Sequence, residues 1–333
     1  MFSNSIDITV AICTYNGEKR LPRVLEALRS QTQVNNITWE VIVINNNSRD
    51  RTEQVVHRYQ QDFPCPLYLY FEPQPGIAIA RRLAVKMAKG ELIAFVDDDN
   101  IPAQNWVNAA VFFARNHPQA GAFGSRLFPE YEVPPPVNFE QIACFLAISD
   151  RGDVPFRYDL LNRWLFPAGA GMVIRTQAWL ECVPVSPLLT GVSQQSLSAK
   201  GEDIETLSYL RQKGWQIWHN PDLKITHVVP KRRLEKPYLF RLFRGVGLSR
   251  YPTRKLQFST IFFPLILILY WLNDGHKLLF FFGRNLLTTK VDLVAQCKRE
   301  LWLYSLLSPF YHWWHFLNRK LTSQFVGLRQ KII

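Results

Sequence analysis

The chain has 333 residues, 47% of them hydrophobic, and a formal net charge of +12. This length allows one large α/β domain with an appendage or two modest domains, and the hydrophobic content excludes a largely disordered chain. The charge is uneven: residues 1–223 carry 20 Lys/Arg and 23 Asp/Glu, a net of −3, whereas residues 224–333 carry 19 and 4, a net of +15. The basic part therefore suits an anionic membrane surface or nucleic acid as its partner.

Cysteine usage and the N-terminus indicate the compartment. The five cysteines are odd in number and no pair has metal-ligand spacing, which favours reduced thiols in the cytosol over a disulfide framework. Residues 1–7 have neither a basic start nor an apolar run, so no signal peptide is expected. We therefore expect a cytoplasmic protein.

Strand and helix patterns alternate along the first 125 residues. Buried-strand patterns occur at 8–13, 40–44, 67–71, 91–96 and 120–123, and helical patterns between them at 18–31, 50–59, 77–89 and 102–116. This alternation predicts an α/β fold with a mostly parallel, twisted central sheet and helices on both faces.

Polar clusters follow three of these strands. They are Thr14-Tyr15-Asn16, Asn45-Asn46-Asn47-Ser48 and Asp97-Asp98-Asp99. In open α/β sheets, ligands bind at the carboxyl ends of the strands, so we expect the three clusters to form one site.

The acidic cluster predicts a metal site. Alternate residues of an extended chain point the same way, so Asp97 and Asp99 can share one cation. Carboxylate oxygens suit Mg²⁺ or Mn²⁺, which keep positions open for diphosphate oxygens. The alternative is a solvated acidic turn, which the buried strand directly before the cluster disfavours.

Three further positions carry candidate chemistry, each with a structural alternative. Glu202 and Asp203 fall in the first turn of an expected helix, where a carboxylate could accept a proton or simply suit the helix dipole. His227 follows an expected strand and could complete the metal site or be structural. Either Arg81 or Arg82 could face a donor pyrophosphate, or both could lie on a solvated helix face.

The order of these motifs resembles that of family 2 glycosyltransferases, which have the GT-A fold. The resemblance covers about residues 6–230, and its segments are Ile8–Asn16, Glu40–Asp50, Gly76–Arg81, Phe95–Asp99, Gly169–Gly171 and Gly201–Asp203. It implies a catalytic domain at 1–230, with a donor half at about 1–125 and an acceptor half at about 126–230.

The resemblance also implies roles for individual residues. The nucleotide sugar would contact the donor-side residues Thr14, Tyr15, Asn16, Asn45, Asn47, Arg81, Asp97 and Asp98. Asp97, Asp99 and His227 would surround the metal. Asp203 would be the general base on the acceptor hydroxyl, with Glu202 orienting it, and transfer would proceed by one inverting displacement. The family usually has Asp where this chain has Asn45, whose amide can still donate and accept hydrogen bonds.

The basic C-terminal region, residues 231–333, combines apolar, aromatic and cationic residues. The uncharged stretch 256–273 and the aromatic-rich stretch 301–317 are both flanked by Lys and Arg. This composition favours helices lying in a membrane interface. The alternatives are a helical subdomain packed on the catalytic core and a re-entrant or single spanning helix, although the apolar run 261–272 is shorter than the ~20 residues that span a bilayer. The long apolar runs disfavour nucleic-acid binding.

The sequence thus predicts an inverting, metal-dependent glycosyltransferase at the cytoplasmic face of a membrane. It would transfer a sugar from a nucleoside diphosphate sugar to a glycan or lipid-linked acceptor in polysaccharide biosynthesis, with no nucleic-acid partner. One alternative is a nucleotidyltransferase, which should have a Gly-rich basic loop where this chain has Thr14–Arg20. The other is a non-catalytic protein with the same fold, to which Asn45 points.

Overall fold

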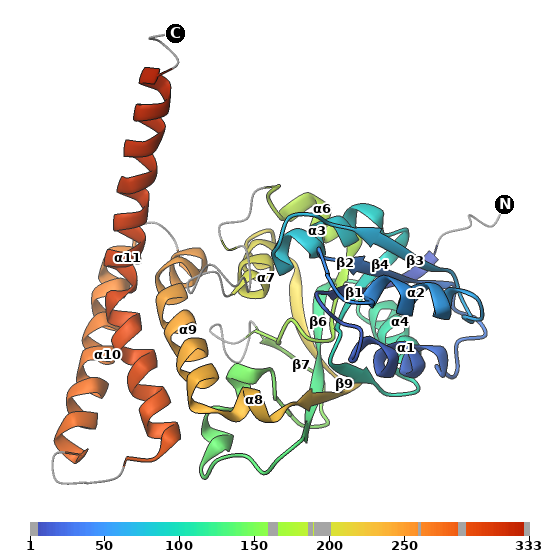
Figure 1. The fold of residues 1–333 in the computed structure, drawn as a ribbon, viewed down its shortest axis with the longest axis horizontal. Helices are drawn as coiled ribbons and strands as arrows, with labels where there is room; N and C mark the ends of the chain where they lie inside the picture. Colours follow the sequence, from blue (N-terminus) through green and yellow to red (C-terminus); the bar gives the residue numbers. More distant parts are fainter. Residues whose placement is uncertain are drawn as a thin grey trace. The chain divides into compact units, whose positions relative to one another are not determined.

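The computed structural model describes residues 6–158, 166–185, 189, 201–258, 261–285 and 291–329 (Figure 1). Contacts divide the chain into two compact units, with the division between Glu235 and Lys236. The first unit contains the sheet, and the second contains the long C-terminal helices.

The strands of the first unit form one mixed sheet, in the order β3-β2-β1-β4-β8-β6-β9-β5, with β7 paired to β9. The first four strands in this order are parallel, β8 is antiparallel to both β4 and β6, and β6 and β9 are parallel. The strands are β1 Ile6–Thr14, β2 Trp39–Asn45, β3 Leu67–Phe71, β4 Gly90–Asp97, β5 Asn100–Pro102, β6 Ala120–Tyr131, β7 Phe156–Arg157, β8 Met172–Arg175 and β9 Gln216–Val229.

Helices cover both faces of this sheet (Figure 1). Side chains alternate along β1, so that Val10 and Ile12 enter one core cluster while Ala11 and Cys13 enter the other. The first cluster includes residues of α1 Leu21–Arg29, α2 Thr52–Gln60 and α4 Trp106–Asn116, and the second includes residues of α3 Ile77–Met87, α6 Thr176–Cys182 and α7 Glu202–Gln212. Short helical segments complete the unit: η1 Phe139–Gln141, η2 Ala143–Leu146 and α8 Lys231–Leu234.

The predicted fold class is confirmed, including the C-terminal helical region. The expected elements of the first 125 residues occur in the expected order, and the purely parallel part of the sheet coincides with them. Antiparallel pairing enters with β8, β5 and β7, all outside the regular strand-helix alternation.

The second unit consists of α9 Lys236–Gln257, α10 Phe263–Asn285 and α11 Leu293–Arg329. Gly247 allows α9 to approach α11 closely, because a Cβ there would lie 2.7 Å from the Cβ of Tyr304 and 2.9 Å from the carbonyl oxygen of Leu301. α10 contacts α11 as well, through the indole nitrogen of Trp271, which donates to the carbonyl oxygen of Leu306 at 3.1 Å.

α10 is longer than the apolar run in the sequence indicates. The helix continues through Asp274 to Asn285, and the segment Phe263–Arg284 is, among the described residues, the one helix long and apolar enough to cross a membrane. The charged residue does not end the helix because the Asp274 carboxylate accepts hydrogen bonds from Arg250 and Arg254 of α9.

Two adjacent phenylalanines on α4, one buried and one exposed, allow the contribution of side-chain burial to the stability of the first unit to be measured. Phe113 is 7% exposed and packs against Phe123 at a ring-centroid distance of 4.9 Å, whereas Phe112 is 64% exposed. We expect Phe113→Ala to lower the free energy of unfolding by about 3–5 kcal/mol, because it removes buried area and leaves a cavity. Phe112→Ala should change it by no more than about 0.5 kcal/mol. Urea unfolding of both variants measures the difference, and equal losses would contradict this core assignment.

Candidate active site

The three polar clusters meet at one edge of the sheet. Parallel register places Cys13 of β1 beside Asp97 of β4, and Thr14 beside Asn45 of β2. The prediction that these strand ends converge is therefore confirmed.

The Asp98 carboxylate is bound by other side chains of the protein. Its carboxylate accepts hydrogen bonds from the Thr14 hydroxyl at 2.6 Å and from Arg20 Nε and Nη2 at 2.9 and 2.8 Å. Gly17 is required beside this contact, because a Cβ there would lie 2.1 Å from Thr14 Oγ1. Asp98 thus ties the loop after β1 to the end of β4, and its predicted contact with the nucleotide stays a prediction.

Asparagines shape the loops after β1 and β2. Asn16 and Asn47 both adopt left-handed conformations, with φ of 51° and 61°, which Asn tolerates better than most residues. Asn16 Oδ1 accepts from the Arg49 amide at 2.9 Å, which joins the two loops, and Asn45 Oδ1 accepts from the Ser48 amide at 2.9 Å.

The outer surface of this edge presents Tyr15 and a small cavity. The Tyr15 side chain is 43% exposed, whereas Asn45 is 5% exposed. Asn45 lines a cavity of about 260 Å³, whose other lining residues are Glu53, His57, Gln60, Leu69 and Phe71. Ligand pockets usually measure about 300–1,000 Å³, so this cavity is smaller than a typical ligand pocket.

Arg81 connects the donor-side strand end to α7. Its guanidinium is buried, with Nη2 3.4 Å from Asp97 Oδ1 and Nη1 3.3 Å from Glu202 Oε1. The guanidinium also lies 5.3 Å from the ring centroid of Phe95, where the aromatic face stabilises a cation. Of the two adjacent arginines, the structure therefore brings Arg81 to the site.

The two carboxylates at the start of α7 have different surroundings. Asp203 accepts from the Gly169 amide at 3.1 Å and from the Ile204 amide at 2.8 Å. Burial raises the pKa of Glu202 to about 7, the charge of Asp203 adds to this increase, and Arg81 opposes it. Burial likewise raises the pKa of Asp97, against the opposing effect of Arg81.

A close backbone approach brings the acidic turn against Arg81. A Cβ at Gly169 would lie 2.9 Å from Arg81 Nη1 and 3.2 Å from the Cβ of Asp203. Only glycine leaves room for both neighbours, so the glycine-rich turn indicated by the sequence has a steric role in the site.

His227 reaches the acidic cluster through strand pairing. β5 and β9 are antiparallel, with Asn100 opposite His227, so that Nε2 of the imidazole lies 3.8 Å from Asp99 Oδ1. Arg233 of α8 lies between these groups: its Nη2 is 2.6 Å from Asp99 Oδ2, and its Nη1 donates to His227 Nε2 at 2.9 Å. Burial lowers the pKa of His227 and Arg233 lowers it further, against the opposing effect of Asp99, which favours a neutral imidazole with its Nε2 lone pair as acceptor.

The ligand types of Asp97, Asp99 and His227 suit a divalent cation, but Arg233 occupies two of these side chains in this structure. Two carboxylates and a neutral imidazole are ligands that Mg²⁺ and Mn²⁺ accept. The guanidinium of Arg233 contacts lone pairs on Asp99 and His227 that such an ion would need. No ready-made metal cluster of His, Cys, Asp and Glu is found among the described residues, consistent with arginines holding these carboxylates.

Two residues of the site escaped the sequence analysis. Arg233 belongs to the basic run Lys231-Arg232-Arg233, whose charge we attributed to the C-terminal region. Its position six residues after His227, on the chain leaving β9, was the available signal. Arg20 and Asp98 form an ion pair although they are 78 positions apart in the chain. The only signal in the sequence was an aspartate at the end of a buried strand, which would need a cationic partner.

Comparison with known proteins identifies a family that shares these features. The family model "Glycosyl transferase family 2" matches residues 9–175, which is half of the chain. The dolichyl-phosphate beta-glucosyltransferase ALG5A of Trichomonas vaginalis is 30% identical over 100 residues, 28% of this chain and 31% of that protein. The glucosyl-dolichyl phosphate glucuronosyltransferase of Haloferax volcanii is 24% identical over 244 residues, 71% of this chain and 74% of that protein. The chain spans about a third of the length of the first curated relatives that it matches, with shares of 31%, 34% and 30%.

Solved structures share the fold. The mannosyltransferase PcManGT from Pyrobaculum calidifontis, in complex with GDP-Man and Mn²⁺, has a TM-score of 0.56 at 17% identity, covering 94% of this chain and 88% of that one. GalNAc-T7 with UDP, GalNAc and Mn²⁺ has a TM-score of 0.52 at 15% identity, covering 74% of this chain and 48% of that one.

The segment matched by the family model takes in the ends of β1, β2 and β4, the three aspartates, Arg81 and the Gly169 turn. These elements form the carboxylate site described above, and together they show that the chain belongs to glycosyl transferase family 2.

Proposed function

We propose that this protein is an inverting, metal-dependent glycosyltransferase. It would transfer a sugar from a nucleoside diphosphate sugar to a glycan or lipid-linked acceptor in polysaccharide biosynthesis. The observation that carries the proposal is the position of Arg81, whose guanidinium contacts both Asp97 at the end of β4 and Glu202 at the start of α7. Carboxylates suited to a donor metal and carboxylates suited to an acceptor hydroxyl therefore face one buried cation.

The donor nucleoside would bind along the loops after β1 and β2. Exposed Tyr15 offers an aromatic face to a base, and the rigid turns at Asn16 and Asn47 present backbone groups beside it. Thr14 and Asn45 lie at the ends of adjacent strands and would hold the nucleoside from below. Structural neighbours solved with UDP and GalNAc, or with GDP-Man, support a nucleoside diphosphate sugar as donor.

The metal would be held by Asp97, Asp99 and His227. A bound divalent cation neutralises charge that develops on the departing diphosphate. Arg233 would release Asp99, because the guanidinium and a metal cannot both use the same carboxylate lone pairs. Arg81 would stay in place, since its side chain is 5% exposed while that of Arg233 is 25% exposed.

Asp203 would be the general base. Amide hydrogen bonds from Gly169 and Ile204 hold its carboxylate in place. The acceptor hydroxyl would give its proton to Asp203 while its oxygen forms a bond to the anomeric carbon. The bond from that carbon to the diphosphate oxygen would break in the same step, which inverts the configuration. Glu202, held by Arg81, would orient the acceptor.

We further propose that residues 1–230 form the catalytic domain and that residues 231–333 bring it to the cytoplasmic, inner face of a membrane, without a nucleic-acid partner. The net charge of +15 in residues 224–333 and the apolar helix α10 support this location. Two matched relatives are named for dolichyl phosphate substrates, which are lipid-linked.

The role of Asp203 is tested by Asp203→Asn. We expect kcat to fall by about 10²–10⁴-fold because the base is removed, with little change in the dissociation constant of the donor. The measurement uses whichever nucleoside diphosphate sugar a donor panel identifies, and the exposed Asp222→Asn on β9 is the matched control. Near-normal turnover by Asp203→Asn would contradict the role of Asp203 as the general base.

The competition between Arg233 and a metal is tested without nucleotide. We expect Arg233→Gln to bind Mn²⁺ at least about tenfold more tightly than the wild type, because a cation that occupies the ligands has been removed. Asp99→Asn should weaken Mn²⁺ binding instead. The exposed neighbour Arg232→Gln is the control, and calorimetric titration is the measurement. Weaker binding by Arg233→Gln would show that the guanidinium is not a competitor.

The raised pKa of Glu202 predicts a pH-dependent stability. Its pKa is about 7 in the folded protein against an ordinary 4.5, so the folded state holds the extra proton and stability falls as pH rises from about 4.5 through 7. Glu202→Gln removes this dependence, so the variant should be the more stable at pH 8 by up to about 3 kcal/mol. Urea unfolding at pH 5 and pH 8 measures it, with the exposed Glu91→Gln as control. If the stability of the wild type relative to Glu202→Gln rose between pH 5 and pH 8, the raised pKa of Glu202 would be contradicted.

A further inference from the structure

α10 presents a broad apolar face that the described residues of its own unit leave exposed. Between 53% and 74% of each of these residues is exposed: Leu265, Ile268, Leu269, Leu272, Leu279, Phe280 and Phe282. Only 6% of its most apolar window is buried. Soluble monomeric proteins rarely expose contiguous apolar patches beyond a few hundred Å², so this face needs a partner.

The opposite face of α10 is tied to α9 and α11. Phe263, Asp274 and Phe281 are its buried residues, at 6%, 1% and 9% exposure. Their spacings of eleven and seven residues are close to whole numbers of helical turns, so the three lie on one side of the helix. The exposed apolar residues centre on the other side.

A buried charge cluster fixes this orientation. The Asp274 carboxylate accepts from Arg250 at 3.3 Å, from Arg254 at 2.9 Å and from the Ser305 hydroxyl at 2.6 Å. The Arg254 guanidinium lies 3.9 Å from the ring centroid of Tyr270, one turn before Asp274. Rotating α10 to cover its apolar face would break these contacts and leave a buried carboxylate unpaired, which is strongly unfavourable.

The cluster also decides between two ways of meeting a bilayer. Asp274 stands at the middle of α10, so a spanning α10 would carry Asp274 and its partners Arg250 and Arg254 to the bilayer centre. Charged side chains at the bilayer centre are costly. A helix lying in the interface plane meets no such cost, because its apolar face enters the acyl boundary while Asp274 faces away.

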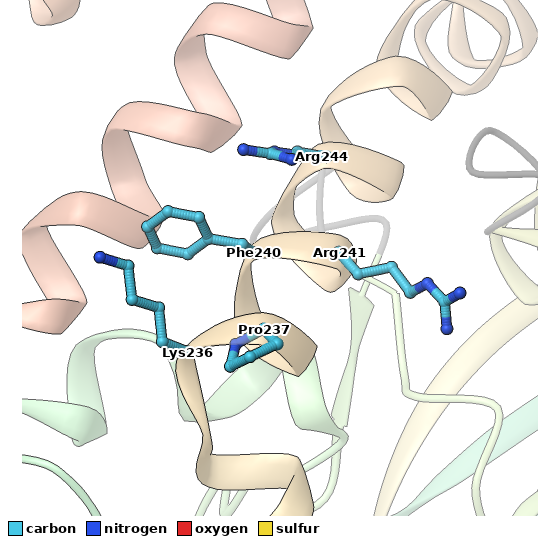
Figure 2. A pocket seen from close by; sticks show the side chains of 5 residues that line it. All are labelled: Lys236, Pro237, Phe240, Arg241 and Arg244. Carbon is cyan, nitrogen blue, oxygen red and sulfur yellow. The ribbon is translucent and has the colours of Figure 1, made fainter.

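Cations along α9 favour an anionic surface. Figure 2 shows Lys236, Phe240 and Arg244 projecting to one side of α9 and Arg241 to the other. Together with Pro237 they line a cavity of about 500 Å³, in which Lys236 Nζ is 5.1 Å from the ring centroid of Phe240. Lys and Arg side chains near an anionic surface add to binding, although the Arg244 guanidinium is also paired with the Glu300 carboxylate of α11 at 2.6 Å.

We propose that α10 is an in-plane membrane anchor: its apolar face lies in the interface of an anionic bilayer, and the Arg250–Asp274–Arg254 cluster holds the opposite face toward α9 and α11. The inference rests on the proposed membrane location and specifies its mode. α11 adds exposed apolar and aromatic residues, namely Leu303, Leu307, Phe310, Trp313 and Trp314. His276 lies on the apolar face of α10 and interrupts it.

The first experiment is flotation of the full-length protein with vesicles of phosphatidylcholine, with and without 30% phosphatidylglycerol (about one charge in three lipids, enough for an anionic surface). We expect binding to the anionic vesicles, and we expect Leu269→Glu to weaken it at least about tenfold, as for a charge placed on a membrane-facing site. Leu180→Glu changes a side chain of similar exposure in the first unit and should bind as the wild type does. Unchanged binding of Leu269→Glu would overturn the proposal.

The second experiment separates in-plane from spanning. Vesicle-bound protein is treated from outside with an acylating reagent that cannot cross the bilayer, and modified lysines are located by mass spectrometry. Lys255 precedes α10 and Lys298 follows it, so an in-plane helix leaves both open to modification from the same side. Protection of one of them until detergent opens the vesicles would show a spanning helix and overturn the proposal. Sugar transfer is assayed separately, so its loss with vesicle binding intact would count against the proposed function alone.

Discussion

The buried guanidinium of Arg81 is the contact on which the site depends. Asp97 and Glu202 are 105 positions apart in the chain, and each lies within 3.4 Å of this one cation. Without it, their carboxylates and that of Asp203 would face one another with little solvent between them, and repulsion would either separate the elements or protonate the acids. Phe95 below the guanidinium and Gly169 beside it keep it in place. Removing Arg81 would therefore leave these carboxylates without their shared cation, which is costly in a buried site.

The second arginine of the site, Arg233, is more exposed than Arg81 and lies on a shorter element. Arg233 binds Asp99 and His227 from the short helix α8, and a quarter of its side chain remains exposed, against 5% for Arg81. A cation on a short, partly exposed element can leave its partners at a lower cost than one enclosed in the core. Under the proposed function, Arg81 would be the permanent positive charge of the site and Arg233 the one that a metal arriving with an anionic diphosphate would displace.

The sequence predicted most of the first half of the fold because its signals there are local. Buried strands such as Ile93–Val96 and amphipathic helices such as α1 show their periodicity within a few residues, and parallel pairing then places the strand ends together. The remaining features depend on distant partners. β8 inserts between β4 and β6 in antiparallel register, and the Arg20–Asp98 and Arg233–Asp99 pairs join residues remote in sequence. No pattern within a window of the chain records such pairs.

The same reason explains why α10 extends beyond the apolar run seen in the sequence. A carboxylate in an apolar stretch signals a boundary when only the local sequence is considered, but here its charge is compensated by residues from another helix. Glu300 of α11 is bound in a similar way, by Arg244 and Arg299. In both units, therefore, arginines remove the cost of burying carboxylates. In the first unit this gathers acidic groups at one site, and in the second it leaves α10 free to present an apolar surface, broken only by His276, on its other side.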